Sequence, residues 1–221
     1  MKSILVISPH ADDEVLGCGG TLLKHLSQKH TLNWILVTNR AKEDPLFESR
    51  QKEIEMIRSE FNFEKFYDLG FLPATLDRVP KMDLITKLAN LFKLIQPEIV
   101  YLPFPGDAHS DHRHVFESAI ACTKKFRNPS IARVLCYEVP SETDFGFNPL
   151  QNSFRPNVFV DISSTLQMKV NLMKIYKGEM KPFPFPRSED SIRSLSKMRG
   201  AIMGVEAAEA FHLIAEHLDI V

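Results

Sequence analysis

The sequence predicts an α/β fold in which helices cover both faces of a mostly parallel sheet. Short apolar runs rich in β-branched residues alternate along the chain with longer segments of helical periodicity, and this alternation is typical of βαβ units. The first run, Lys2–Ser8 (KSILVIS), has an apolar centre, as expected of a strand that is buried on both faces. The chain has 221 residues, and we assign 1–221 to a single domain.

The expected strands are short runs in which apolar and β-branched residues dominate. In chain order they are Lys2–Ser8, Thr31–Thr38, Lys65–Leu69, Glu98–Pro103, Val134–Val139 and Asn157–Ile162. Most of them are followed by polar or glycine-containing segments, which are typical of the loops that lead from a strand into a helix. These loops are therefore the places to search for functional residues.

The expected helices are segments whose apolar residues recur with helical spacing. In chain order they are Thr21–Leu26, Glu48–Phe61, Met82–Ile95, His112–Phe126, Ser164–Gly178, Ser188–Met203 and Val205–Leu218. Met82–Ile95 is the clearest, because Leu88, Phe92 and Ile95 share one face. The proline-rich segment Lys181–Arg187 (KPFPFPR) predicts a loop, which we expect near the functional site. Its Phe183–Phe185 part suits a sugar platform, a lid or a subunit contact equally well.

Composition and charge exclude several classes of function. The chain has 27 basic and 28 acidic residues and a formal net charge of −1, which argues against a nucleic-acid partner and a polybasic membrane anchor. No apolar run is long enough for a membrane span. Three widely spaced cysteines without a CxxC pair favour a reducing, cytoplasmic location. We expect a small-molecule partner, and a homo-oligomer stays possible.

Two polar loops carry an unusual concentration of histidine and aspartate. His10 and Asp13 follow the first expected strand, and His109 and His112 follow the strand Glu98–Pro103. Ligands of open α/β sheets bind at the carboxyl ends of the strands. We therefore expect the two loops to meet at that edge of the sheet.

The residue types in these loops suit a catalytic metal site. His10, Asp13 and His112 would provide three protein ligands and leave one position open, which is the arrangement of catalytic zinc; other divalent metals remain possible. Asp12 is then left as a carboxylate beside the metal, suited to act as general base. His109 would stabilise an oxyanion or protonate a leaving amine.

Each of these assignments has a simpler structural alternative. Asp111 is expected to hold the imidazole of His109 in its charged form, but aspartates at helix starts also serve as caps. Asp107 would contact the site or cap its loop. Arg50 would clamp the substrate or pair with a nearby glutamate on its helix. The Gly17–Gly20 run fits a dinucleotide fingerprint poorly, because acidic residues crowd the loop.

The two loops also resemble the signatures of a known family. PHADDEVLGCGGTL (Pro9–Leu22) and GDAHSDHR (Gly106–Arg113) are similar to the two motifs of the PIG-L/LmbE zinc-dependent de-N-acetylases. The Arg50–Glu53 segment resembles the family's R-x-x-E. Ala11 and Ser110 replace motif prolines, at positions that supply no ligand in the family. The resemblance implies a Rossmann-like fold.

The resemblance also implies site roles and a function. It makes His10, Asp13 and His112 the zinc ligands and Asp12 the general base, and it places His109, supported by Asp111, at the transition state. Segments 137–143, 154–163 and 199–211 look like those of members acting on sugars. We therefore expect removal of an N-acetyl group from an amino sugar or sugar conjugate. The alternatives are deacetylation of a thiol-precursor glycoside, hydrolysis of another amide, or a non-catalytic sugar-nucleotide-binding module.

Overall fold

A seven-stranded sheet forms the centre of the computed structural model, which describes residues 1–146 and 153–218. Its strands are β1 (Ser3–Ser8), β2 (Thr31–Thr38), β3 (Lys65–Phe71), β4 (Ile99–Pro103), β5 (Arg133–Tyr137), β6 (Val158–Asp161) and β7 (Ala208–Glu216). They lie in the order β3-β2-β1-β4-β5-β7-β6. The first five strands pair in parallel, and only β7 pairs antiparallel, with β5 and β6. The expected mostly parallel sheet is confirmed.

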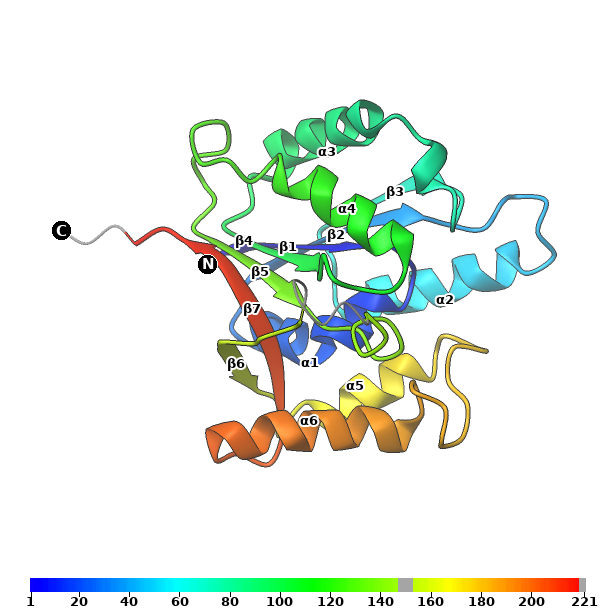
Figure 1. The fold of residues 1–221 in the computed structure, drawn as a ribbon, viewed down its shortest axis with the longest axis vertical. Coiled ribbons are helices and arrows are strands. Elements are labelled where there is room, and N and C mark those ends of the chain that lie inside the picture. The colour runs from blue at the N-terminus through cyan, green and yellow to red at the C-terminus, as the bar shows by residue number, and fades with distance from the viewer. Residues whose placement is uncertain (147–152, 219–221) are drawn as a thin grey trace.

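Helices cover both faces of this sheet. They are α1 (Asp13–Ser27), α2 (Phe47–Glu60), α3 (Lys81–Ile95), α4 (Ser110–Ile120), α5 (Leu166–Met173) and α6 (Glu189–Met203), with a short 3₁₀ turn, η1 (Leu76–Arg78). Figure 1 shows α3 and α4 on one face and the other four helices on the opposite face. Each face buries its own apolar cluster against the sheet. None of the described helices has the length and apolar composition needed to cross a bilayer.

The C-terminal helix expected over Val205–Leu218 is wrong, because this segment forms strand β7. Gly204 adopts a left-handed conformation (φ 70°) and ends α6, as glycine commonly does after a helix. Strand β7 then pairs along both of its edges, with β5 on one side and β6 on the other. Pairing with two strands outweighs the helix propensity of its alanines and glutamates.

The neighbours β1 and β4 bring distant parts of the sequence together. Their register runs from Ile4 opposite Ile99 to Val6 opposite Tyr101. The chain builds outward from β1 through β2 to β3 and then returns to β4 on the other side of β1. Such a reversal opens a crevice at the carboxyl ends of the two strands. The two loops that carry the histidines and aspartates leave the sheet at this point.

Helix α1 is kinked near its start, where the glycine run lies. Cys18 departs from helical geometry (φ −144°, ψ 18°), and Gly17 faces the ring of Tyr137 so closely that a Cβ there would overlap it. The second part of α1 begins against Glu209 of β7, whose carboxylate accepts the N–H groups of Gly20 (2.9 Å) and Thr21 (2.7 Å). The glycines therefore serve close packing, as the sequence indicates.

Candidate metal and catalytic site

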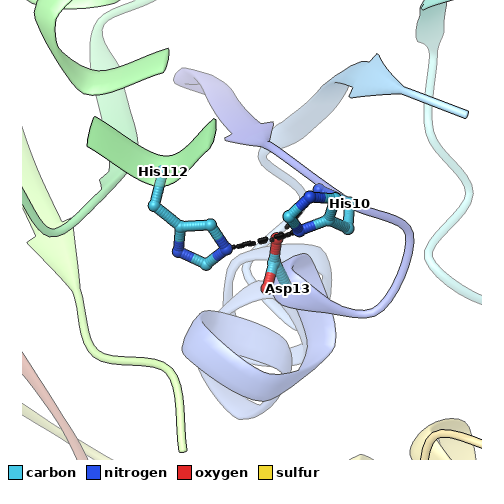
Figure 2. A group of neighbouring side chains, drawn as sticks. All are labelled: His10, Asp13 and His112. Carbon is cyan, nitrogen blue, oxygen red and sulfur yellow. Dashed lines mark hydrogen bonds and ion pairs between the residues drawn. The ribbon is translucent and has the colours of Figure 1, made fainter. Parts of the chain in front are cut away.

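His10, Asp13 and His112 converge from three places in the fold. His10 lies in the loop after β1, Asp13 begins α1, and His112 lies in the first turn of α4 (Figure 2). Asp13 Oδ2 lies 3.4 Å from His10 Nδ1 and 3.3 Å from His112 Nε2. The two imidazole nitrogens lie 3.4 Å from each other. Three donor atoms thus form a nearly equilateral triangle.

The size of this triangle suits a tetrahedral metal ion. Zinc ligands lie about 2.0–2.2 Å from the ion, so two tetrahedral ligands are roughly 3.3–3.6 Å apart. The three donor distances of 3.3–3.4 Å fall in this range. Two imidazoles and one carboxylate are also a ligand set that zinc prefers. The residues present therefore fit a divalent metal with a further position open.

Two buried carboxylates orient the histidines. Asp107 Oδ2 lies 2.8 Å from His112 Nδ1, and Asp111 Oδ2 lies 3.1 Å from His10 Nε2. Each carboxylate accepts the proton of its imidazole, so the other ring nitrogen faces Asp13 and would offer its lone pair to a metal ion once its own proton has left. Such carboxylate partners fix the tautomer of metal-binding histidines and increase their basicity.

The carboxylates also control the charge of the histidines. Burial alone lowers the pKa of both imidazoles, but hydrogen bonds and charge interactions with the surrounding aspartates outweigh it and raise the pKa of His10 to about 9 and of His112 to about 10. Asp13 is buried, yet the facing imidazoles hold its pKa well below the usual range. Without a metal, protons therefore hold this cluster together, and a metal ion would displace them.

Asp12 lies beside the ligand set in a strained conformation. Its backbone has φ 148°, a region that residues other than glycine rarely adopt. The residue is 3% exposed. Burial, together with the charges of Asp13 and Glu179, raises the pKa of Asp12 to about 8, against the opposing charges of Arg187 and His10. A carboxyl group that titrates near neutral pH suits both acceptance and return of a proton.

His109 caps helix α4, and its ring lies beside the rings of His10 and His112. Its Nδ1 accepts the backbone N–H of Asp111 at 3.1 Å, so its proton resides on Nε2. Burial and the charges of His10 and His112 lower its pKa to about 4, and the imidazole is neutral at pH 7. The Asp111 carboxylate lies 3.9 Å from His109 but 3.1 Å from His10. Asp111 therefore supports His10 more closely than the expected His109.

His10, His109 and Asp111 form a second group with metal-ligating atoms within 4.8 Å of one another. This group shares His10 with the first one. Its Asp111 oxygen already accepts the backbone N–H of Ala74 at 2.7 Å, and Nδ1 of His109 accepts a backbone N–H. In the first group Asp13 Oδ2 also accepts a backbone N–H, from His10 at 2.9 Å, but no described backbone N–H donates to the imidazole nitrogens that face Asp13, and the first group is therefore the stronger candidate for a metal site.

Arg50 lies at the site, but protein atoms occupy all its nitrogens. Nη1 donates to the backbone oxygen of Ala11 at 3.2 Å, Nη2 pairs with Glu179, and Nε lies 3.4 Å from Glu53. The residue is 7% exposed. These contacts brace the loop that carries Asp12. They leave Arg50 less free to clamp a substrate than its sequence position indicates.

A cavity of about 550 Å³ opens over these residues. Its lining joins the two motif loops to the loops after β2 and β3 and to the segment between α5 and α6. The lining residues are His10, Ala11, Asp12, Asp13, Thr38, Asn39, Arg40, Ala41, Asp44, Arg50, Leu72, Pro73, His109, His112, Glu142, Glu179 and Arg187. This volume is in the range of small-molecule sites.

Several of the lining residues carry no recognisable pattern in the sequence. Glu179 and Arg187 come from the segment between α5 and α6, where the proline-rich run marked only a loop. Arg187 Nη1 lies 3.0 Å from Asp12 Oδ2, which confirms that the Lys181–Arg187 loop reaches the site. Glu142 lines the cavity next to Thr143, whose hydroxyl donates to Asp107 Oδ1 at 2.6 Å. No regular spacing connects these residues with the motif loops.

Comparison with known proteins places these features in context. Residues 5–123 match the PIG-L family model, described as GlcNAc-PI de-N-acetylase. The diacetylchitobiose deacetylase of Thermococcus kodakarensis is 24% identical, over 97% of this chain and 84% of that protein. The 4-oxalmesaconate hydratase of Pseudomonas putida is also 24% identical, over 80% of this chain and 74% of that protein. The structure of N,N'-diacetylchitobiose deacetylase from Pyrococcus horikoshii superposes with a TM-score of 0.76 at 22% identity, covering 96% of this chain and 84% of that one.

Proposed function

Because the chain belongs to the PIG-L family, we propose that it is a metal-dependent hydrolase that removes the N-acetyl group from an amino sugar. His10, Asp13 and His112 would hold the metal ion, and zinc is the metal we propose. The observation that carries this proposal is the donor triangle of 3.3–3.4 Å, which fits tetrahedral zinc and lies beside a buried, unliganded carboxylate.

The roles of the surrounding residues follow from their geometry. When bound, the metal would supply Lewis-acid polarisation of the amide carbonyl and an acidified water. Asp12 accepts a proton from the attacking water and returns it to the amine nitrogen as the C–N bond breaks. His109 is neutral and carries its proton on Nε2, so it donates a hydrogen bond to the developing oxyanion. Asp107 and Asp111 hold His112 and His10 in the tautomers that leave a nitrogen free for the metal.

Charge pairing in the cavity favours a neutral saccharide over an anionic conjugate. Five carboxylates and three guanidinium groups line the cavity, and every one of these arginines already has a carboxylate partner. The pairs are Arg40–Asp44, Arg50–Glu179 and Arg187–Asp12. No guanidinium is thus left unpaired to recognise a phosphate or a second carboxylate. We propose that the group attached to the amino sugar is uncharged and rich in hydroxyls.

The same pairing separates this proposal from two alternatives. A hydratase of a carboxylate compound, as one relative is named, would need an unpaired cation for its substrate. A thiol-precursor glycoside that carries a carboxylate would need one as well. A non-catalytic sugar-nucleotide-binding module would need no metal cluster and no buried carboxylate beside it.

We further propose the cytoplasm as the location of the enzyme. Cys18, Cys122 and Cys136 are buried and free of disulfide bonds. Burial raises the pKa of each thiol, so these side chains act as small packing residues. A reducing compartment suits a chain with this cysteine usage.

Purified protein would test the proposed function through its metal content and its release of free amine. N-acetylglucosamine, diacetylchitobiose, N-acetylglucosaminyl malate and a sugar nucleotide form a suitable substrate panel. We expect about one zinc per chain and preferential deacetylation of the neutral sugars. Protein that binds no divalent metal would contradict the proposed metal-dependent hydrolase. Faster deacetylation of the malate conjugate would contradict the proposed preference for a neutral substrate.

Three variants would separate the roles within the site. Asp12→Asn should retain the metal and lose about 10²–10⁴ in turnover, because an amide cannot accept the proton. His109→Ala should also retain the metal and lower kcat more than it raises KM. His112→Ala should lose the metal. A fully active Asp12→Asn would rule out the proposed base.

A further inference from the structure

Arg187, in the segment between α5 and α6, contacts the proposed general base, Asp12, through its guanidinium group. Arg187 Nη1 lies 3.0 Å from Asp12 Oδ2. Among the described residues, no other side chain donates a hydrogen bond to this carboxylate. Oδ1 has no hydrogen bond from any described residue and stays available to a proton. The two oxygens of Asp12 therefore have different surroundings.

The backbone around Arg187 is held firmly in place. Ser188 caps helix α6 by accepting the N–H of Ser191, and its own N–H donates to the Phe185 oxygen at 2.9 Å. The guanidinium lies over the Phe185 ring, 5.5 Å from its centre. Arg187 thus occupies the last position before a capped helix, where its backbone direction is defined. This geometry gives the proline-rich loop a function: it presents Arg187 to the site.

A second contact fixes the plane of the guanidinium. Arg187 Nη2 lies 3.4 Å from Glu179 Oε2, and Glu179 also pairs with Arg50. Charges of alternating sign therefore run from Asp12 to helix α2. The side chain of Arg187 is 23% exposed, so water reaches it only in part. Lysine has one ammonium group and cannot reproduce this fork between two carboxylates.

We propose that Arg187 is a positioning residue for the deacetylation, which holds Asp12 through Oδ2 so that Oδ1 faces the attacking water. This inference rests on the proposed function. Asp12 needs such a partner, because it is 3% exposed and its backbone is strained at φ 148°. Without Arg187 the buried carboxylate loses its only hydrogen-bonded counter-charge among the described residues, and no other described side chain holds its orientation.

Kinetics of Arg187 variants would test this role. We expect Arg187→Ala to lower kcat about 10–100-fold, because small displacements of a catalytic group cost about 10²-fold. Metal content and KM should stay close to those of the wild type. Arg187→Lys should recover only part of the rate, and added guanidinium ion should partly restore Arg187→Ala. Guanidinium rescue would not follow if Arg187 served only to fold the loop.

Arg193→Ala provides a matched control. Arg193 pairs with Glu189 on the same helix, α6, at 2.8 Å, and it does not line the cavity. Its removal should leave kcat and guanidinium sensitivity unchanged. An Arg187→Ala enzyme with wild-type kcat would overturn the proposal, and so would a variant in which only KM rises, since that pattern indicates substrate binding.

A double-mutant cycle gives a readout that does not depend on activity. Asp12→Asn, Arg187→Gln and the double variant would be compared by denaturant unfolding of the metal-free protein. If the ion pair forms as described, the two changes should be non-additive by at least about fivefold in the unfolding equilibrium constant; additivity would overturn the pairing. A wild type that deacetylates no N-acetyl sugar would overturn the proposed function and the positioning role together. An active wild type with an active Arg187→Ala would overturn the positioning role alone.

Discussion

Replacement of Asp107 by asparagine should weaken metal binding without removing a ligand. Asp107 is 1% exposed, and its two oxygens contact His112 Nδ1 (2.8 Å) and the Thr143 hydroxyl (2.6 Å). In Asp107→Asn the amide oxygen still accepts from His112, while the amide N–H₂ donates to Thr143. The tautomer of His112 is therefore preserved and only the negative charge is lost.

The size of this effect follows from the role of the lost charge. Removal of a carboxylate that supports a metal-binding histidine typically weakens metal affinity 10–100-fold, or about 1.4–2.7 kcal/mol. A hydrogen bond to a charged group contributes about 1.5–3 kcal/mol, which agrees with this range. We therefore expect a dissociation constant for zinc that is 10–100-fold higher than that of the wild type.

Competition with a chelating dye at constant pH would measure the affinity, and circular dichroism would check the fold. Asp161→Asn is the control, because Asp161 is an exposed carboxylate on β6 that contacts only Ser163 among the described residues. Equal zinc affinity of Asp107→Asn and the wild type would refute the argument that the Asp107 charge sets the basicity of His112.

Three further outcomes follow from the structure. The metal-free protein should become less stable toward denaturant as the pH rises from 7 to 10. His10 and His112 have pKa values of about 9 and 10 in the folded state and about 6.5 in the unfolded state. Their protonation therefore stabilises the fold fully below about pH 6.5, and this stabilisation is lost as the pH rises through the folded-state values. Bound zinc should flatten this profile. Glu209→Gln should cost about 3–5 kcal/mol of unfolding free energy, because buried Lys169 loses its charge partner at 2.6 Å; a change below 1 kcal/mol by urea unfolding would contradict the importance of this ion pair. Gly17→Ala should cost about 1–3 kcal/mol, since its methyl group would overlap the Tyr137 ring; an unchanged melting temperature would contradict that contact.

Much of the sheet could be predicted from the sequence because its first five strands carry a simple signal. Buried parallel strands such as β1 are continuous apolar runs, and the helices between them have helical periodicity. The segment that forms β7 lacks β-branched residues except Ile214, and only its pairing partners make it a strand. The prediction of a helix here was therefore wrong because pairing with distant strands, not local sequence, determines the conformation of this segment. The assignment of 1–221 to one domain stays a prediction.

Some features of the candidate site could also be predicted from the sequence, and others could not. Strand order brings the loops after β1 and β4 together, so the convergence of His10, Asp13 and His112 could be predicted from strand order and residue type, while their role as metal ligands stays a prediction. The choice of Asp111 as a partner for His10 rather than His109 depends on side-chain distances, which spacing does not encode. Arg187 enters from a loop about 175 positions from Asp12, and no rule of local structure connects the two.

The contact between β7 and α1 has a consequence for biosynthesis. The ribosome makes α1 before every other described helix, whereas Glu209, which binds the N–H groups of Gly20 and Thr21, is made 188 positions after Thr21. During translation these two amides and the side chain of Lys169 have no carboxylate from β7. The second part of α1 thus gains its carboxylate cap only after β7 leaves the exit tunnel.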